Sequence, residues 1–240
     1  MSDEDSDSDF DVWNDTGRYT HRNDIVSNFS DKYSEFDEED DRLRYKPLPQ
    51  RKDSGEFDHP LGDALKLVHV QPDGNCLFHC YVLAINSVWP DLRVTVRDLR
   101  KVVANRSTES EFEVAKALYD AAIEEKDYEL LAQVSHMQGV RSLEDYKRVL
   151  QTSSFWGNEQ CFFHLRKFSG LVPVVITLND RGRAVVSRQI YDETSEDIET
   201  KDSNLYILLL LKSSHYWLIS LRGQYVIGRD LYEEFIKYVD

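Results

Sequence analysis

The feature that most constrains this sequence is the stretch 71–80, QPDGNCLFHC, in which turn-forming residues run directly into an apolar, helix-compatible pattern. Proline, aspartate, glycine and asparagine favour a tight loop, and the preceding residues 67–70 are typical of a short strand. The pattern therefore predicts a strand, a loop and a helix in that order. Cys76 is expected at the point where the loop enters the helix.

A cysteine in that position is a candidate nucleophile. The first backbone N–H groups of a helix have no partner within the helix, and the helix dipole adds partial positive charge at the same end. Both features favour a thiolate, and the same N–H groups can hold an oxyanion. The alternative is that Cys76 is a small buried residue of an apolar helix.

Negative charge is concentrated at the N-terminal end of the chain. The 240 residues carry a formal net charge of −15, and residues 1–60 contribute −10 of it, with 18 acidic against 8 basic side chains. A segment of this composition cannot offset its ordering entropy by burying apolar surface. We therefore expect residues 1–60 to be an acidic, disordered tail and 61–240 to form one folded domain. The scattered apolar residues of the tail fit either a solubilising segment or motifs that bind an unidentified protein partner.

Composition also disfavours several partners. Neither part of the chain has the basic stripe that binds nucleic acid or an anionic membrane surface. The longest apolar run, 205–211, has the length of a buried strand, whereas a membrane span needs roughly 20 residues. The chain has three cysteines, an odd number, and its start lacks the basic and apolar regions of a secretory signal. We therefore expect reduced thiols and a cytoplasmic or nuclear location.

Apolar spacing predicts an α+β fold with a helical half followed by a sheet half. Spacings of three and four residues predict helices at 94–104, 111–125, 127–134, 142–150 and 159–168, and Ser142 has the pattern of a capping box. Strands are predicted at 172–178, 184–191, 206–211 and 215–220, followed by a final helix at 230–239. The strand at 206–211 is apolar on every residue, so both of its faces should be covered.

A cysteine protease needs a base within hydrogen-bond reach of its thiol, normally from a distant part of the chain. Of the seven histidines, His215 alone opens a strand beside the predicted central one, where catalytic groups are commonly displayed. His79 follows Cys76 on the same helix and is expected to point away from the loop. His164 lies between aromatic residues and is expected to be packed. His215 is therefore the candidate base.

At this point the residues resemble a known family. The loop 73–78, DGNCLF, is similar to the active-site loop of the ovarian tumour (OTU) family of cysteine proteases, which are deubiquitinases. Trp156-Gly157 and the segment after it are similar to the middle block of the family, and His215-Tyr216 resembles its histidine block. The resemblance covers residues 65–221 in the correct order. It implies a papain-like cysteine protease fold of OTU type, with a central, mostly antiparallel sheet flanked by a helical lobe.

The resemblance implies roles for individual residues. Cys76 would be the nucleophile, His215 the general base and later the acid, and Gly74 and Asn75 part of the loop that supplies oxyanion donors. The substrate would be the isopeptide bond of ubiquitin or a ubiquitin-like modifier. The partners would be ubiquitin or polyubiquitin and the proteins conjugated to it, and no cofactor or metal is expected.

The ubiquitin C-terminus is extended and ends in glycines, so the resemblance also implies a narrow substrate channel over the cysteine. Trp156 and Trp217 are the candidate channel residues, although Trp156 equally fits a core anchor. Many family members place aspartate or asparagine two residues after the histidine, where this chain has Trp217. Because indole donates a hydrogen bond and accepts none, Trp217 cannot orient the imidazole in that way. Asp73 is the remaining candidate, and a Cys-His dyad without a carboxylate is the alternative.

Other classes of function stay open at this stage. The chain could keep the fold and bind ubiquitin with weak or no turnover. It could also be a papain-like peptidase or transferase, although a papain-type Cys-Gly-Ser-Cys-Trp sequence is not present. A metal site built from Cys76, His79 and Cys80 would lack the paired spacing of zinc motifs. Cys80 and Cys161 are expected to be core residues.

Overall fold

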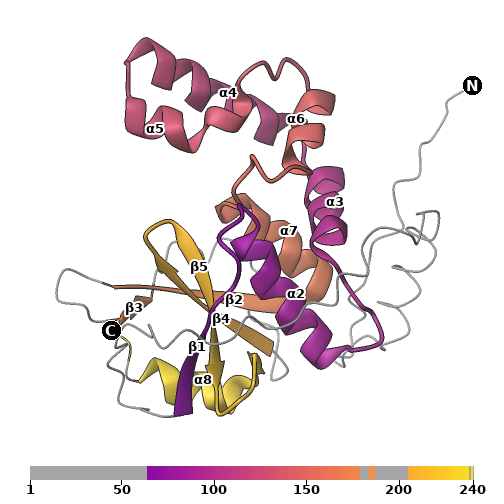
Figure 1. Ribbon diagram of the computed structural model, residues 1–240, viewed down its shortest axis with the longest axis vertical. Coiled ribbons are helices and arrows are strands. Elements are labelled where there is room, and N and C mark those ends of the chain that lie inside the picture. The colour runs from indigo at the N-terminus through magenta and orange to yellow at the C-terminus, as the bar shows by residue number, and fades with distance from the viewer. Residues whose placement is uncertain (1–63, 179–183, 187–204, 238, 240) are drawn as a thin grey trace, which may run out of the picture.

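The computed structural model describes residues 64–178, 184–186, 205–237 and 239 (Figure 1). The predicted tail at 1–60 lies outside the described residues, and so do residues 187–191 of the strand predicted at 184–191.

Helices dominate the first half of the described chain and strands the second, as the apolar spacing predicts. The elements are β1 (Leu65–Val68), α2 (Cys76–Val88), α3 (Val96–Arg106), α4 (Glu109–Glu124), α5 (Tyr128–Gln133), the 3₁₀ helix η2 (Ser135–Met137), α6 (Leu143–Leu150), α7 (Glu159–Ser169), β2 (Leu171–Leu178), β3 (Ala184–Val186), β4 (Leu205–Lys212), β5 (His215–Leu221), β6 (Val226–Ile227) and α8 (Arg229–Ile236). None of these helices combines the length and apolarity that crossing a bilayer requires.

The strands form one sheet in the order β1-β5-β4-β2-β3, with β6 paired to β4. The pairing is antiparallel except between β2 and β4, which run parallel from the Leu171 and Leu205 pair to the Thr177 and Leu211 pair. The fold is therefore α+β with a mostly antiparallel central sheet, as predicted. β4 lies between β5 and β2, in the position expected for the most apolar strand.

Both faces of the sheet are covered, and the side chains of β4 alternate between them. Ile207 and Leu209 belong to the core shared with α2, α3 and α7, whereas Leu208 and Leu210 belong to a second core closed by α8. In Figure 1, α2 and α7 lie beside the sheet, and α4 and α5 lie at the end of the molecule remote from α8. This arrangement brings the first turn of α2 to the start of β5.

Side-chain caps explain where several helices begin. Complete capping boxes start α3 and α4, at Thr95 and Thr108. At α6, Ser142 accepts from the Asp145 N–H as predicted, but the Asp145 carboxylate accepts from the Arg141 N–H instead of the Ser142 N–H. The predicted box at Ser142 is therefore only half formed.

Candidate active site

The loop before Cys76 enters a helix where the sequence predicts it. Cys76 is the first residue of α2, and the following Leu77, Phe78 and Cys80 are buried and anchor that end of the helix in the core. The thiol therefore lies at a helix N-terminus on a rigid support. Cys80 and Cys161 are fully buried, as predicted.

The backbone of Tyr216 joins the Cys76 helix to the His215 strand. The Tyr216 N–H donates to Cys76 Sγ at 3.5 Å, across 140 positions of sequence, and Cys80 Sγ donates to the Tyr216 carbonyl at 3.9 Å. Both contacts fix the first turn of α2 against the start of β5. Cys76 and His215, which are distant in sequence, are thus brought to neighbouring positions.

The Cys76 thiol is less acidic than its place at a helix end would suggest. Burial raises its pKa, and the hydrogen bonds from the N–H groups of Tyr216 and Leu77 lower it less than burial raises it. The nearby Asp73 charge raises the pKa further. Attack by this sulfur therefore requires a base to take its proton.

His215 is placed to act as a neutral base. Burial lowers its pKa, and so does His69, whose ring centroid lies 5.9 Å from that of His215. A hydrogen bond with the Val70 backbone and the charge of Asp73 act in the opposite direction without reversing the shift. The Trp217 ring meets the imidazole edge-on at 5.4 Å, which restricts the orientation of the ring.

No hydrogen bond joins the Cys76 thiol to the His215 ring in the part of the chain that the structure describes. The Nε2 atom of His215 is buried and has no hydrogen-bond partner there. In unliganded enzymes such hydrogen bonds are often long and form only when substrate binds.

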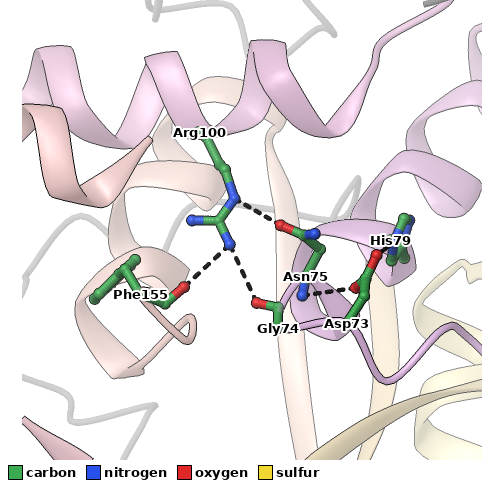
Figure 2. A network of polar contacts seen from close by, with 6 residues as sticks. All are labelled: Asp73, Gly74, Asn75, His79, Arg100 and Phe155. Carbon is green, nitrogen blue, oxygen red and sulfur yellow. Dashed lines mark hydrogen bonds and ion pairs between the residues drawn. The ribbon is translucent and has the colours of Figure 1, made fainter. Parts of the chain in front are cut away.

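The Asp73 carboxylate lies in the loop and binds His79 (Figure 2). Its Oδ2 lies 3.1 Å from His79 Nε2, and its Oδ1 accepts from the Asn75 N–H at 2.9 Å. Partial burial alone would raise the pKa of Asp73, but the bonds with His79 and Asn75 outweigh it and hold the pKa below its ordinary value. The prediction that His79 points away from the loop is wrong. The role of Asp73 in orienting His215 stays a prediction, because the structure records no hydrogen bond between these two described residues.

The loop geometry narrows the choice of oxyanion donors. The Asn75 N–H already donates to Asp73, whereas the N–H groups of Cys76 and Leu77 lie near enough to the sulfur to lower the pKa of the Cys76 thiol. Gly74 has φ +82°, and a Cβ at this position would collide with the carbonyl oxygen of Ser153. Gly74 is thus required by both the turn and the close approach of the 150–155 segment.

The two candidate channel tryptophans have different neighbours, Gly74 for Trp156 and His215 for Trp217. Trp156 is 62% exposed, so the interpretation of it as a core anchor is wrong; the neighbouring Phe155, at 1%, is the buried residue. The Trp156 Nε1 atom would lie 3.3 Å from a Cβ at Gly74, which places the indole beside the loop. Trp217 shares a strand face with His215 and is half-buried. A channel role for either residue stays a prediction.

Sequence reasoning missed Arg100, a buried cation that reaches the same loop. Its Nε donates to Asn75 Oδ1 at 2.8 Å, and its Nη2 donates to the Gly74 carbonyl at 3.1 Å (Figure 2). A signal was available, because Arg100 lies between Leu99 and Val103 on the apolar face of α3. His69 and Val70 were also missed as neighbours of His215, and no sequence pattern points to them. His164 is buried as expected and pairs with Glu111 at 3.1 Å.

Comparison with known proteins gives fold-level similarities only. No model of a known family matches the sequence, and no curated protein matches it. The chain is similar to an OTU domain solved in complex with ubiquitin, at 18% identity and a TM-score of 0.40 over 69% of this chain and 76% of that one. It is also similar to an OTU deubiquitinase from Wolbachia pipientis wMel, at 14% identity and a TM-score of 0.39 over 72% and 96% of the two chains. A viral OTU domain protease from Farallon virus gives 17% identity and a TM-score of 0.38 over 67% and 86%. Similarities of this size assign no function to the chain.

Proposed function

We propose that this protein is a thiol-dependent deubiquitinase of OTU type, which hydrolyses isopeptide bonds formed by the C-terminus of ubiquitin or a ubiquitin-like modifier. The observation that carries the proposal is the 3.5 Å contact between the Tyr216 N–H and Cys76 Sγ. It brings the DGNC loop and the His-Tyr pair together, and these are the two segments on which the family resemblance rests. A cysteine at a helix N-terminus beside a histidine at a strand end has the parts needed for nucleophilic acyl transfer.

The reaction would proceed in two steps through a thioester. His215 takes the proton of the Cys76 thiol as the sulfur attacks the carbonyl carbon of the terminal glycine, and the N–H groups of Cys76 and Leu77 hold the oxyanion. His215 then gives that proton to the departing lysine amine. In the second step His215 removes a proton from water, hydroxide adds to the thioester, and the proton returns to the sulfur as the carboxylic acid leaves and loses its own proton to solvent. No redox change is involved and no cofactor is needed.

The imidazole would be held in place without a carboxylate on its own strand. The Val70 backbone hydrogen-bonds the His215 ring, and the rings of His69 and Trp217 pack 4.8 Å apart next to it. A backbone carbonyl can accept the ring N–H as a carboxylate does, although it stabilises imidazolium less. We therefore expect turnover by a dyad supported by the backbone.

A ubiquitin probe with a C-terminal electrophile tests the proposal. Wild-type protein should form a covalent adduct, and Cys76→Ala should lose it. Cys161→Ala is the matched control, because Cys161 is a fully buried thiol on another helix and its removal should leave labelling intact. Absence of an adduct with folded wild-type protein would reject the proposal that the protein is a deubiquitinase.

One observation favours a second function, that of a ubiquitin-binding protein with little or no turnover. The thiol has a raised pKa and His215 Nε2 has no partner among the described residues, so the pair is not assembled in this conformation. Saturable binding of ubiquitin without adduct formation or cleavage of di-ubiquitin would select this function. A panel of differently linked di-ubiquitins would show linkage preference in the case of turnover.

A further inference from the structure

Arg100 is a buried cation that bonds to neutral oxygens on two loops. It is 3% exposed, and its Nη1 donates to the Leu150 carbonyl at 2.8 Å while its Nη2 donates to the Phe155 carbonyl at 3.0 Å. With the bonds to Gly74 and Asn75, it makes four hydrogen bonds, and the described residues include no carboxylate in ion-pair contact with it. Its guanidinium carbon also lies 4.3 Å from the centre of the Phe78 ring.

Such a residue is costly to bury, and its charge persists. Burial lowers the pKa of Arg100 to about 10, so the group is still protonated at neutral pH. An apolar side chain of similar volume is often at least as stabilising as a buried ionic group, so burial alone does not account for an arginine here. What an apolar residue cannot supply is a set of donors in a fixed planar fork.

Arg100 and Asp73 both form hydrogen bonds with the peptide group between Gly74 and Asn75. The Gly74 carbonyl accepts from Arg100 Nη2 at 3.1 Å, and the N–H of the same peptide, on Asn75, donates to Asp73 Oδ1 at 2.9 Å. Figure 2 shows the two side chains on opposite sides of this loop. A cation on the C=O end and an anion on the N–H end both oppose rotation of the peptide plane. Cys76 follows directly, so the orientation of this plane sets the direction in which the chain enters α2.

The other bonds of Arg100 tie this peptide to the segment that carries Trp156. The Leu150 carbonyl is at the C-terminal end of α6, where helix carbonyls lack partners within the helix, and Phe155 precedes Trp156. The guanidinium of Arg100 therefore lies between the 73–76 loop and the 150–156 segment and holds them at a fixed distance. These two segments approach each other so closely that residue 74 must be glycine.

We propose that Arg100 is a positioning residue of the active site, which together with Asp73 fixes the Gly74–Asn75 peptide and thereby the oxyanion-binding N–H groups beside Cys76. The inference rests on the proposed function for its effect on catalysis, but the fixed peptide itself does not depend on the substrate. It also gives Asp73 a role in the loop that is separate from any effect on His215. A misplacement of about 1 Å in such a group can cost on the order of 100-fold in rate.

The kinetic test compares Arg100→Met and Arg100→Lys with Arg97→Met, which removes an exposed cation from the same helix. Both Arg100 variants should lower kcat on a fluorogenic ubiquitin substrate by about 10-fold or more, with a smaller change in KM, because the lost geometry serves the transition state. Lysine keeps the charge but cannot bridge both loops, so it should not restore kcat. Arg97→Met should behave as wild type. Arg100 variants with wild-type kcat would overturn the proposal.

A second measurement, amide hydrogen exchange at Asn75, requires no substrate and no activity. Exchange of the Asn75 N–H should speed up by about 10-fold or more in the Arg100 variants, while amides in the middle of α2 keep their protection. Equal loosening of the loop and the helix would mean a general structural role and would overturn the proposal. If the Arg100 variants do not fold, Asp73→Ala removes the acceptor of the Asn75 N–H without leaving a buried cation unpaired, and it must show the same local increase. If the wild-type protein is inactive on ubiquitin, the proposed function is rejected. The exchange measurement would still show whether Arg100 and Asp73 fix the Gly74–Asn75 peptide.

Discussion

Asp73 forms its ion pair with His79, 3.1 Å away in the first turn of α2, and not with His215. An acidic residue three positions before the nucleophile therefore stabilises the loop itself. Its bonds to His79 and to the Asn75 N–H hold the carboxylate in the ionised form. Loss of Asp73 should therefore act through loop geometry as well as through its charge near the site.

We predict that Asp73→Ala slows turnover well beyond its effect on folding, because the Asn75 N–H and His79 lose a shared acceptor. Asp73→Asn keeps an oxygen that can accept from Asn75, so its kcat should lie between those of Asp73→Ala and wild type. His79→Ala is the matched variant that removes the ion pair and leaves the carboxylate. Measurement of kcat next to the free energy of unfolding separates the two effects. Wild-type rates in Asp73→Ala would contradict the prediction.

The same carboxylate gives a pH dependence of stability with a definite sign. The pKa of Asp73 is lowered in the folded protein, so its ionised form stabilises the fold above the ordinary aspartate pKa, and this contribution is lost as the pH falls through the lower, folded value. We therefore expect the difference in unfolding free energy between wild type and Asp73→Asn to be largest near neutral pH and to shrink in acid. Urea unfolding at several pH values measures it. If the difference in unfolding free energy between wild type and Asp73→Asn grew as the pH fell, the prediction would be wrong.

The reactivity of Cys76 should also show whether the Cys76 thiol and the His215 imidazole are neutral or charged. Burial raises the thiol pKa and lowers that of His215, so both groups are neutral near pH 7 in the free protein. Alkylation of Cys76 by iodoacetamide should thus be slow at neutral pH and should rise toward alkaline pH, with an apparent pKa above the ordinary cysteine range. Cys76→Ala is the control for the other thiols. Rapid alkylation at pH 6 would instead indicate a preformed thiolate–imidazolium pair.

Glycine at 74 can be tested against Gly139, which has nearly the same φ. Gly74 and Gly139 have φ values of +82° and +79°, but a Cβ would collide with Ser153 only at Gly74, and at Gly139 it would meet nothing within 4 Å. Gly139→Ala should cost about 1–2 kcal/mol of unfolding free energy, the penalty of a left-handed conformation. Gly74→Ala should cost more and should abolish labelling by the ubiquitin probe, since the 73–76 loop must move. If the two variants lost the same unfolding free energy and both kept labelling, the close approach of Ser153 to Gly74 would not matter for the site.

The sequence predicts the parts of this site that depend on local pattern. Turn chemistry places Cys76 at the start of α2, and the strand pattern places His215 at the start of β5. The direction of His79 could also have been inferred, because helix side chains tilt toward the N-terminus and so bring a residue of the first turn over the preceding loop. The pattern of α3 shows that Arg100 lies on its apolar face, but it does not show what Arg100 bonds to. Its partners include carbonyls at 74, 150 and 155, which only the tertiary fold brings together.

Trp156 supplies a prediction about substrate recognition. Its ring is exposed and lies beside Gly74, two residues before Cys76. We expect an extended peptide that approaches Cys76 to contact this ring. Trp156→Ala should raise KM for a ubiquitin substrate several-fold with a smaller change in kcat, and should alter the free energy of unfolding by less than about 0.5 kcal/mol, as expected at an exposed position. Phe163→Ala removes an equally exposed aromatic ring, at 63%, and is the matched control. If both variants have wild-type KM, the substrate peptide does not contact this indole.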